Sequence, residues 1–158
     1  GGAGADPLLK MYEDEGDEYA SLLVKSLLDR LAEAATEWLH ARMRREYWGY
    51  AADENLTIAE MLSVKYQGIR PAVGYPSIPD QSANFLLHDL IDSKEIGISL
   101  TENGVMFPNA SVSGFFFGHP LSKYFAIGPI SEAQMEDYAL RRGVPVQDIR
   151  KFLLANLP

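Results

Sequence analysis

The longest periodic pattern of hydrophobic positions lies in residues 17–48. Apolar side chains recur there at every fourth position: Leu23, Leu27, Leu31, Ala35, Leu39 and Met43. Val24, Leu28, Ala34 and Trp38 stand beside them, which makes one broad apolar stripe typical of an amphipathic helix. Acidic residues lead the segment and arginines end it, an order that suits the helix dipole. We therefore predict one long helix over 17–48.

Two capping-box patterns mark the starts of later helices. Thr57-Ile58-Ala59-Glu60 predicts a short helix that ends near Gly68, and Ser131-Glu132-Ala133-Gln134 predicts one that stops at Gly143. The spacing of apolar residues predicts two further helices, over residues 81–92 and about 146–154.

The pattern between these helices changes to short extended runs. Residues 96–101 read as a strand, Asn103-Gly104 as a turn, and residues 110–117 and 124–127 as two further strands. Helices, then a three-stranded antiparallel meander, then helices indicate an α+β fold. We expect a long helix plus a small antiparallel β-meander flanked by helices. Because so small a sheet leaves edges that need a neighbour, we expect it to be part of a larger fold.

Length and composition narrow the function classes. The chain has 158 residues, the size of one domain, and 47% of them are hydrophobic. A net charge of −8 and a pI near 4.8 disfavour nucleic acid and anionic membranes as partners. The absence of cysteine excludes disulfides and thiolate metal sites, and it fits a cytoplasmic location. No apolar run is long enough to span a bilayer, and we expect residues 1–16 to be a flexible or truncated N-terminal segment.

Self-contained catalytic machinery is not evident in the sequence. The three histidines, His40, His88 and His119, have no second residue at a convincing metal-ligand spacing. The chain also lacks the hydrolase, P-loop and dinucleotide-binding glycine motifs. We therefore predict no metal site and no catalytic residue within this chain.

The segment Gly68–Pro76, with the sequence GIRPAVGYP, is the best candidate for a binding wall. Its prolines restrain Arg70 and Tyr75 to extended conformations, and Gly74 permits backbone angles that other residues avoid. Arg70 offers a planar fork of donors suited to a carboxylate or phosphate. The result would be a stiff strip whose amides and carbonyls are free to bind a small zwitterionic or aromatic ligand. The alternative is a loop packed on the core, with Arg70 paired to a local acid.

A second concentration of aromatic residues lies in the stretch SVSGFFFGHPLSKYF, residues 111–125. Alternation along a strand sends Phe116 to the face opposite Phe115 and Phe117, and packing explains most of these rings. Tyr124 is the exception, because it stands beside a turn, where binding residues often lie.

Five long stretches of the chain are distinctive as ordered blocks: VKSLLDRLAEA (24–34), REYWGYAADENL (45–56), YQGIRPAVGYP (66–76), LTENGVMFPNASVSGFFFGHPLSKYFAIG (100–128) and EDYALRRG (136–143). Together they resemble a known family, the C-terminal activation domain of cobalamin-dependent methionine synthase, which binds S-adenosylmethionine. The resemblance runs from about Asp17 to Leu157, so residues 17–158 are expected to be the C-terminal part of that domain.

The resemblance implies a set of residues that bind S-adenosylmethionine. Arg70 would hold the carboxylate of the ligand, and the backbone around Ala72 and Gly74 would line the ligand. Tyr75 would lie near the reactive methyl group, and Tyr124 and Phe125 would complete the pocket. Glu33 matches a family acid near the ligand's amino group. The chain departs from the family at Val73, where proline is usual, and in length, because the family's complete domain begins well upstream.

The function implied by the resemblance is the reductive remethylation of cob(II)alamin in methionine biosynthesis. The module would present S-adenosylmethionine to the cobalamin of a neighbouring domain, and flavodoxin or a flavoprotein reductase would supply an electron. The chain would be part of an enzyme, methionine synthase, and would not be catalytic alone. The alternative is an acidic protein-interaction domain that docks the electron donor or the cobalamin domain. A stand-alone methyltransferase is disfavoured, because no glycine-rich loop follows a parallel strand.

Overall fold

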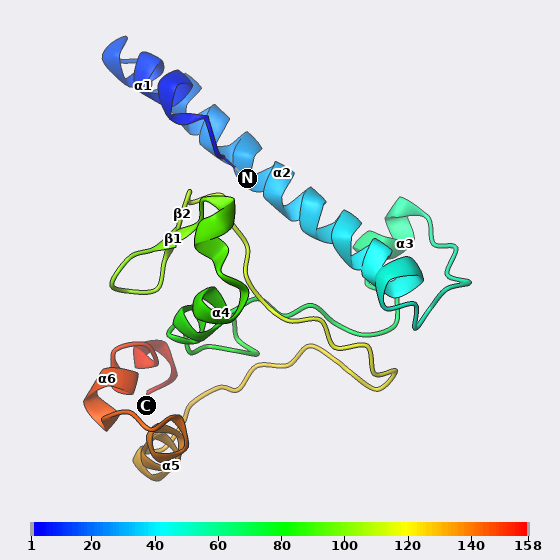
Figure 1. Cartoon of the computed structure of the whole chain (residues 1–158), viewed down its shortest axis with the longest axis vertical. Coiled ribbons are helices and arrows are strands. Elements are labelled where there is room, and N and C mark those ends of the chain that lie inside the picture. The colour runs from blue at the N-terminus through cyan, green and yellow to red at the C-terminus, as the bar shows by residue number, and fades with distance from the viewer. Residues whose placement is uncertain (1, 158) are drawn as a thin grey trace.

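The structure is a computed structural model that describes residues 2–157, and its architecture is the predicted α+β class. One long helix runs as a diagonal rod, and both strands and the last three helices lie on one side of it (Figure 1). The helices are α1 (Asp6–Asp14), α2 (Glu18–Arg42), α3 (Ile58–Leu62), α4 (Ala83–Ile91), α5 (Glu132–Arg142) and α6 (Val146–Arg150), and the strands are β1 (Ser99–Leu100) and β2 (Met106–Phe107).

The long helix predicted over 17–48 is confirmed. The side chain of Asp17 caps α2 by accepting a hydrogen bond from the Ala20 N–H at 2.9 Å. A π-helical turn, Met43–Tyr47, continues the rod beyond Arg42. The preceding helix α1 was not predicted from the sequence. It lies within the segment 1–16 that we expected to be flexible or truncated, and it packs against α2.

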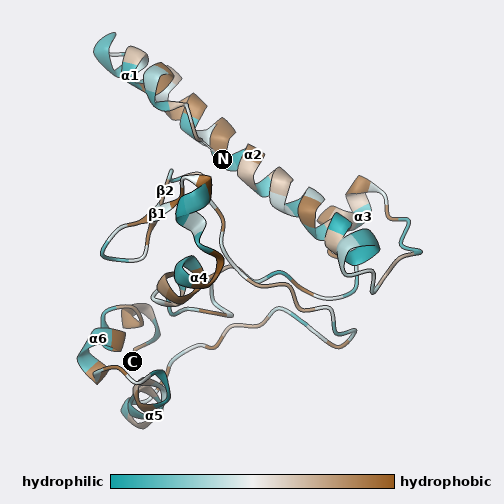
Figure 2. Ribbon diagram, in the orientation of Figure 1, coloured by the Kyte–Doolittle hydropathy of each residue, from teal (hydrophilic) through white to brown (hydrophobic). Residues whose placement is uncertain are grey.

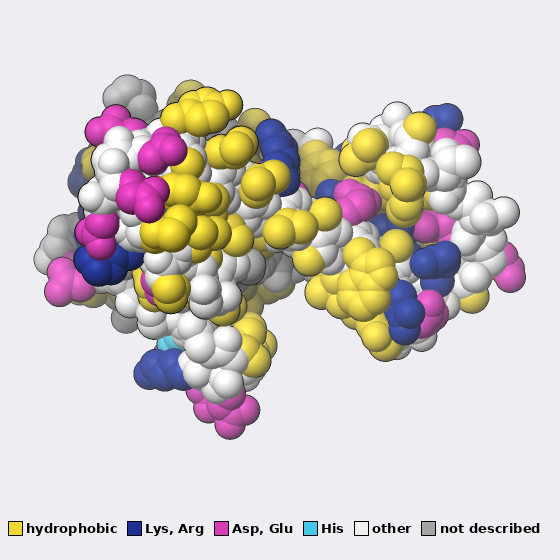
Figure 3. Space-filling model, turned by 90° about the horizontal axis from the view of Figure 1, so that it is seen from above, with side chains coloured by type: hydrophobic (Ala, Val, Ile, Leu, Met, Phe, Trp, Pro, Cys, Tyr) yellow, Lys and Arg dark blue, Asp and Glu magenta, His cyan; other side chains and the backbone are white. Residues whose placement is uncertain are grey.

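Much of the apolar stripe on α2 faces outward. Leu23, Leu27 and Leu31 are 48%, 54% and 64% exposed. Figure 2 shows hydrophobic and hydrophilic residues alternating along this rod, and Figure 3 shows hydrophobic side chains gathered on the face seen from above. Periodicity therefore predicted the helix but not which of its residues are buried within this chain.

The predicted three-stranded meander is wrong, because the structure has a two-stranded hairpin. β1 pairs antiparallel with β2, with Ser99 opposite Phe107, and the predicted Asn103-Gly104 turn joins them. Residues 124–127 form no strand, and residues 110–117 make only isolated bridges, Ala72 to Gly114 and Ile69 to Phe117. Two features explain why no regular ladder forms there. Pro71 has no N–H to donate, and Gly114 lies so close to Pro71 that a Cβ would be 2.4 Å from its carbonyl oxygen.

The later helices follow their predicted starts, but some end early. Both capping boxes form, at Thr57 and Ser131, and Gly143 ends α5 with φ of +66°. α3 ends at Leu62 rather than near Gly68, and α6 ends at Arg150 rather than at 154. The hydrophobic core of this region joins α5 to α6 through four buried residues, Met135, Ala139, Ile149 and Leu153.

No helix within residues 2–157 combines the length and the apolar character needed to cross a membrane.

Candidate functional site

A groove of about 1190 Å³ lies between the second half of α2 and two irregular segments, 70–77 and 124–126. Its volume slightly exceeds the usual range for small-molecule pockets. The groove brings together six of the seven residues predicted to bind the ligand: Glu33, Arg70, Ala72, Tyr75, Tyr124 and Phe125. Gly74, the seventh, is not among its lining residues. The structure therefore places in one groove residues that are up to 92 positions apart in the sequence, Glu33 and Phe125.

The wall formed by residues 69–76 is held by its own backbone amides. The N–H of Ile69 donates to the Phe117 carbonyl at 2.9 Å, and the N–H of Gly74 donates to the Ile78 carbonyl at 2.8 Å. The N–H of Arg70 donates to the hydroxyl of Tyr124 at 2.9 Å. The prediction that the amides of this strip are free to bind a ligand is therefore wrong for Ile69, Arg70 and Gly74. These amides fix the wall instead.

Two positions in the wall show what its unusual residues do. Gly74 has φ of +88°, a conformation that side chains disfavour, and a Cβ there would meet nothing closer than 3.9 Å. Glycine is therefore needed for the backbone angle and not for close approach. Val73, where the resemblance led us to expect proline, uses its N–H to donate to the Ser113 carbonyl at 3.0 Å. The extra donor therefore ties the wall to the neighbouring segment.

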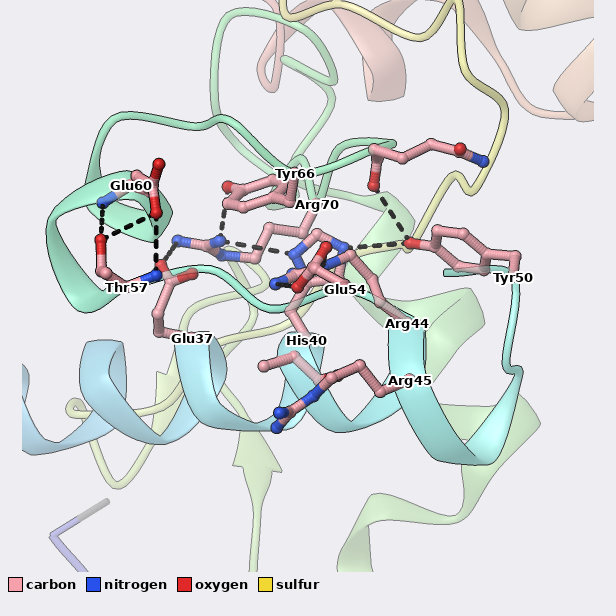
Figure 4. A network of polar contacts seen from close by, with 12 residues as sticks. Glu37, His40, Arg44, Arg45, Tyr50, Glu54, Thr57, Glu60, Tyr66 and Arg70 are labelled. Carbon is pink, nitrogen blue, oxygen red and sulfur yellow. Dashed lines mark hydrogen bonds and ion pairs between the residues drawn. The ribbon is translucent and has the colours of Figure 1, made fainter. Parts of the chain in front are cut away.

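The guanidinium of Arg70 is held at the groove by three side chains (Figure 4). Nη2 pairs with Oε2 of Glu37 at 2.5 Å, and Nη1 donates to the hydroxyl of Tyr66 at 2.7 Å. Nη1 also lies 3.5 Å from Nδ1 of His40. The side chains of Arg70 and Glu37 are 23% and 19% exposed, so the ion pair is largely shielded but still reaches the groove. Arg70 is thus both paired with a local acid and part of the groove wall.

His40 supports this arrangement as a neutral ring. It is fully buried, stacks on Phe116 and meets Tyr66 edge-on. Burial, with the nearby charges of Arg44 and Arg70, lowers the pKa of His40 to about 3. Because Arg70 can only donate, Nδ1 of His40 acts as the acceptor, and Nε2–H faces the hydroxyl of Tyr50 at 3.3 Å.

A second ion pair, Arg44 with Glu54, shares the ring of Tyr66 with the pair of Arg70 and Glu37. Arg44 is fully buried and forms a bidentate pair with Glu54, with Nη2 to Oε1 at 2.7 Å and Nε to Oε2 at 2.8 Å. Its guanidinium carbon lies 4.3 Å from the centre of the Tyr66 ring. Burial raises the pKa of Tyr66 to about 12, so its hydroxyl stays protonated at neutral pH. Tyr66, which holds Arg70, is thus itself packed against a buried ion pair.

Glu37, His40 and Tyr66 were not predicted from the sequence as site residues. Glu37 lies one helical turn after Glu33, and His40 and Arg44 follow at helical spacing on the same rod. Polar residues at that spacing, on one face of the helix, were the available indication of a polar face. Which loop meets this face could not be inferred, because Glu37 and Arg70 are 33 residues apart.

The remaining predicted residues have different environments within the groove. Glu33 pairs with Arg30 at 2.7 Å, and its side chain is 61% exposed. Tyr75 and Phe125 are also exposed, which leaves two aromatic rings available along the groove. Within residues 2–157 no group of three or more histidine and acidic side chains is placed to hold a metal ion.

Comparisons with known proteins identify the family and the fold. Residues 1–143 match a family described as the activation domain of vitamin B12 dependent methionine synthase. A solved structure, described as the MetH reactivation domain bound to AdoHcy, matches 96% of this chain with 46% sequence identity and a TM-score of 0.92. The present chain covers 47% of that structure's chain, so it spans about half of its length.

Proposed function

The chain belongs to the family of activation domains of vitamin B12 dependent methionine synthase, and on this premise we propose that its groove binds S-adenosylmethionine and the demethylated product S-adenosylhomocysteine. The single observation that carries the proposal is the Arg70 guanidinium, held at a groove that also contains exposed aromatic rings. The relative that is 46% identical is described as bound to AdoHcy.

The residues of the groove fit the parts of such a ligand. Among the described residues, Nε of Arg70 makes no hydrogen bond, so this donor is available to the carboxylate of the amino-acid end. Tyr75 and Phe125 offer faces against which an adenine or thioether can stack. Ala72 leaves room beside them, and Tyr124 holds the Arg70 backbone in place.

The role of the module would be to position the methyl donor. Fixing both ends of the ligand on a rigid wall orients the sulfonium methyl group and lowers the entropic cost of transfer. The methyl-accepting chemistry would be supplied by the cobalamin of a neighbouring domain, and flavodoxin or a flavoprotein reductase would supply the electron that this chemistry requires. In this proposal residues 17–158 form the C-terminal part of the activation domain of a cytoplasmic methionine synthase and catalyse nothing alone.

The test is a calorimetric titration of the 158-residue chain with S-adenosylhomocysteine. The parent chain should bind, and Arg70→Ala should lose about a hundredfold or more in affinity, because a charge-assisted contact is removed. Arg141→Ala removes an exposed arginine that pairs with Asp137, outside the groove, and should bind like the parent. Absence of binding by the folded parent would refute the proposal for this chain. Equal binding by Arg70→Ala would refute the role of Arg70.

A further inference from the structure

The charges that line the groove add up to zero. Its charged side chains are three arginines and three glutamates: Arg30, Arg45, Arg70, Glu33, Glu37 and Glu54. Each glutamate is already in an ion pair, Glu33 with Arg30, Glu37 with Arg70 and Glu54 with Arg44. The groove therefore does not present an uncompensated positive charge at Arg70, as a site for a simple anion would.

In the ion pair between Arg70 and Glu37, one oxygen of the carboxylate has no hydrogen-bond donor among the described residues. Oε2 of Glu37 takes the contact with Arg70, while Oε1 is buried and has no hydrogen-bond partner among the described residues. A buried carboxylate oxygen without a donor is costly, and a ligand that brings a donor removes this cost. The comparable acid elsewhere in the fold, Asp80, has partners on both carboxylate oxygens.

These observations set a requirement on the ligand. A carboxylate that binds Arg70 comes close to the carboxylate of Glu37, and two like charges at such short range repel each other strongly in a partly dry site. An α-ammonium group on the same ligand offsets this repulsion, because the ligand then brings no net charge to the amino-acid end. The same group also brings a donor close to Glu37, one of whose oxygens has no partner among the described residues.

We infer that Glu37 is a specificity-determining residue, which makes the groove accept α-amino carboxylates and reject carboxylates that lack the amino group. The inference rests on the proposed function, and it assigns the selection for the amino group to Glu37. Glu33, the acid suggested by family resemblance, is 61% exposed and paired with Arg30, so water screens its charge far more.

The experiment compares two ligands on the same chain. One is S-adenosylhomocysteine, and the other is its analogue in which hydrogen replaces the α-amino group. Calorimetric affinities for both give a preference ratio, which should be about tenfold or more for the parent. Glu37→Gln keeps the shape and one acceptor but removes the charge, so the preference should fall by about tenfold, chiefly because the deaminated analogue binds better. Glu46→Gln, an acid of the same rod that pairs with Arg42 outside the groove, should keep the parental ratio.

Two further variants make the result decisive. Glu37→Asp retains the charge and should retain the preference; if it behaves like Glu37→Gln, charge is not the cause and the inference is overturned. If Glu33→Gln narrows the preference and Glu37→Gln does not, the inference is also overturned. A parent that binds neither ligand refutes the proposed function, and the inference falls with it. A parent that binds both ligands equally refutes the inference alone. Circular dichroism of each variant confirms that the helices are retained.

Discussion

Two networks in this protein each combine an arginine, an acid and a tyrosine, but the acid has all its hydrogen-bond partners in only one of them. We call that one the closed network and the other the open network. In one, Arg70 pairs with Glu37 and donates to Tyr66, four residues before it. In the other, Arg142 pairs with Asp80 and donates at 2.9 Å to Tyr138, also four residues before it. The first lines the groove, and the second lies outside it and joins α5 to the segment before α4.

The difference lies in how completely the acid is satisfied. Oδ1 of Asp80 accepts from the N–H of Ser82 at 2.8 Å, and Oδ2 accepts from the hydroxyl of Tyr138 at 2.7 Å as well as from Arg142. The side chain of Asp80 is 5% exposed. Glu37, in contrast, has a buried oxygen without a partner among the described residues. A saturated network can only stabilise the fold, whereas an unsaturated one beside a groove can also bind a ligand.

The largest effect should come from breaking the closed network. Asp80→Ala leaves Arg142 and Tyr138 without their buried acceptor, so we expect the free energy of unfolding to fall by about 3–5 kcal/mol in urea denaturation. Asp137→Ala removes an exposed partner of Arg141 and should cost at most about 1 kcal/mol. Ligand affinity of the folded Asp80→Ala protein should stay at the parental value. If Asp80→Ala lowered the free energy of unfolding no more than Asp137→Ala does, the Asp80 network would not have the stabilising role proposed for it.

Mild acid should affect the open network through His40. Its pKa is about 3 in the folded protein, whereas an exposed histidine has a pKa of 6.5, so the unfolded chain binds more protons between these values. The stabilising effect of a neutral His40 is therefore present above pH 6.5 and is lost as the pH falls, by up to about 1.4 kcal/mol per pH unit. Urea denaturation at pH 7, 6 and 5 measures this slope. For His40→Asn, the free energy of unfolding should change less with pH over the same range. An equal slope in both proteins would exclude His40 as the cause.

Replacing Arg70 or Arg142 with lysine should show which network governs ligand affinity and which governs stability. Arg70→Lys keeps the positive charge but loses the planar fork, so ligand affinity should fall by about 10- to 100-fold while the melting temperature changes little. Arg142→Lys should instead lower stability by about 1–3 kcal/mol and leave affinity unchanged. Calorimetric titration gives the ligand affinity of each variant, and thermal unfolding gives its stability. Comparable losses of affinity in the two variants would remove the distinction between the networks.

The smallest effects should come from the tyrosine hydroxyls. Tyr138→Phe removes a donor to Asp80 and should lower the free energy of unfolding by about 0.5–1.5 kcal/mol without changing affinity. Tyr66→Phe removes an acceptor of Arg70 and should weaken ligand binding several-fold. Titration and urea denaturation of the two variants measure both quantities. If Tyr66→Phe bound the ligand as the parent does, the hydroxyl of Tyr66 would have no part in holding Arg70.

Local patterns predicted the features that depend on neighbours in the sequence. The four-residue spacing of apolar residues located α2, and the capping boxes at Thr57 and Ser131 located the starts of α3 and α5. The turn at Asn103-Gly104 and the stiffness around Arg70 were also predicted, because turn chemistry and proline act on adjacent residues. Helix ends were less accurate, since α3 ends at Leu62 and α6 at Arg150, before the predicted ends.

The tertiary structure alone decided the features that join distant parts of the chain. Tyr124 meets the Arg70 backbone across 54 residues, and Glu37 meets the Arg70 side chain across 33. The strand predicted over 110–117 became isolated bridges, because Pro71 and the close approach of Gly114 interrupt a regular ladder. The sequence by itself thus determined the α+β class, the long helix and the residue types of the wall at residues 69–76. The tertiary structure decides which acid pairs with Arg70 and leaves one oxygen of Glu37 without a hydrogen-bond partner among the described residues. The sequence alone does not decide this, since helix propensity and turn chemistry act only over a few residues.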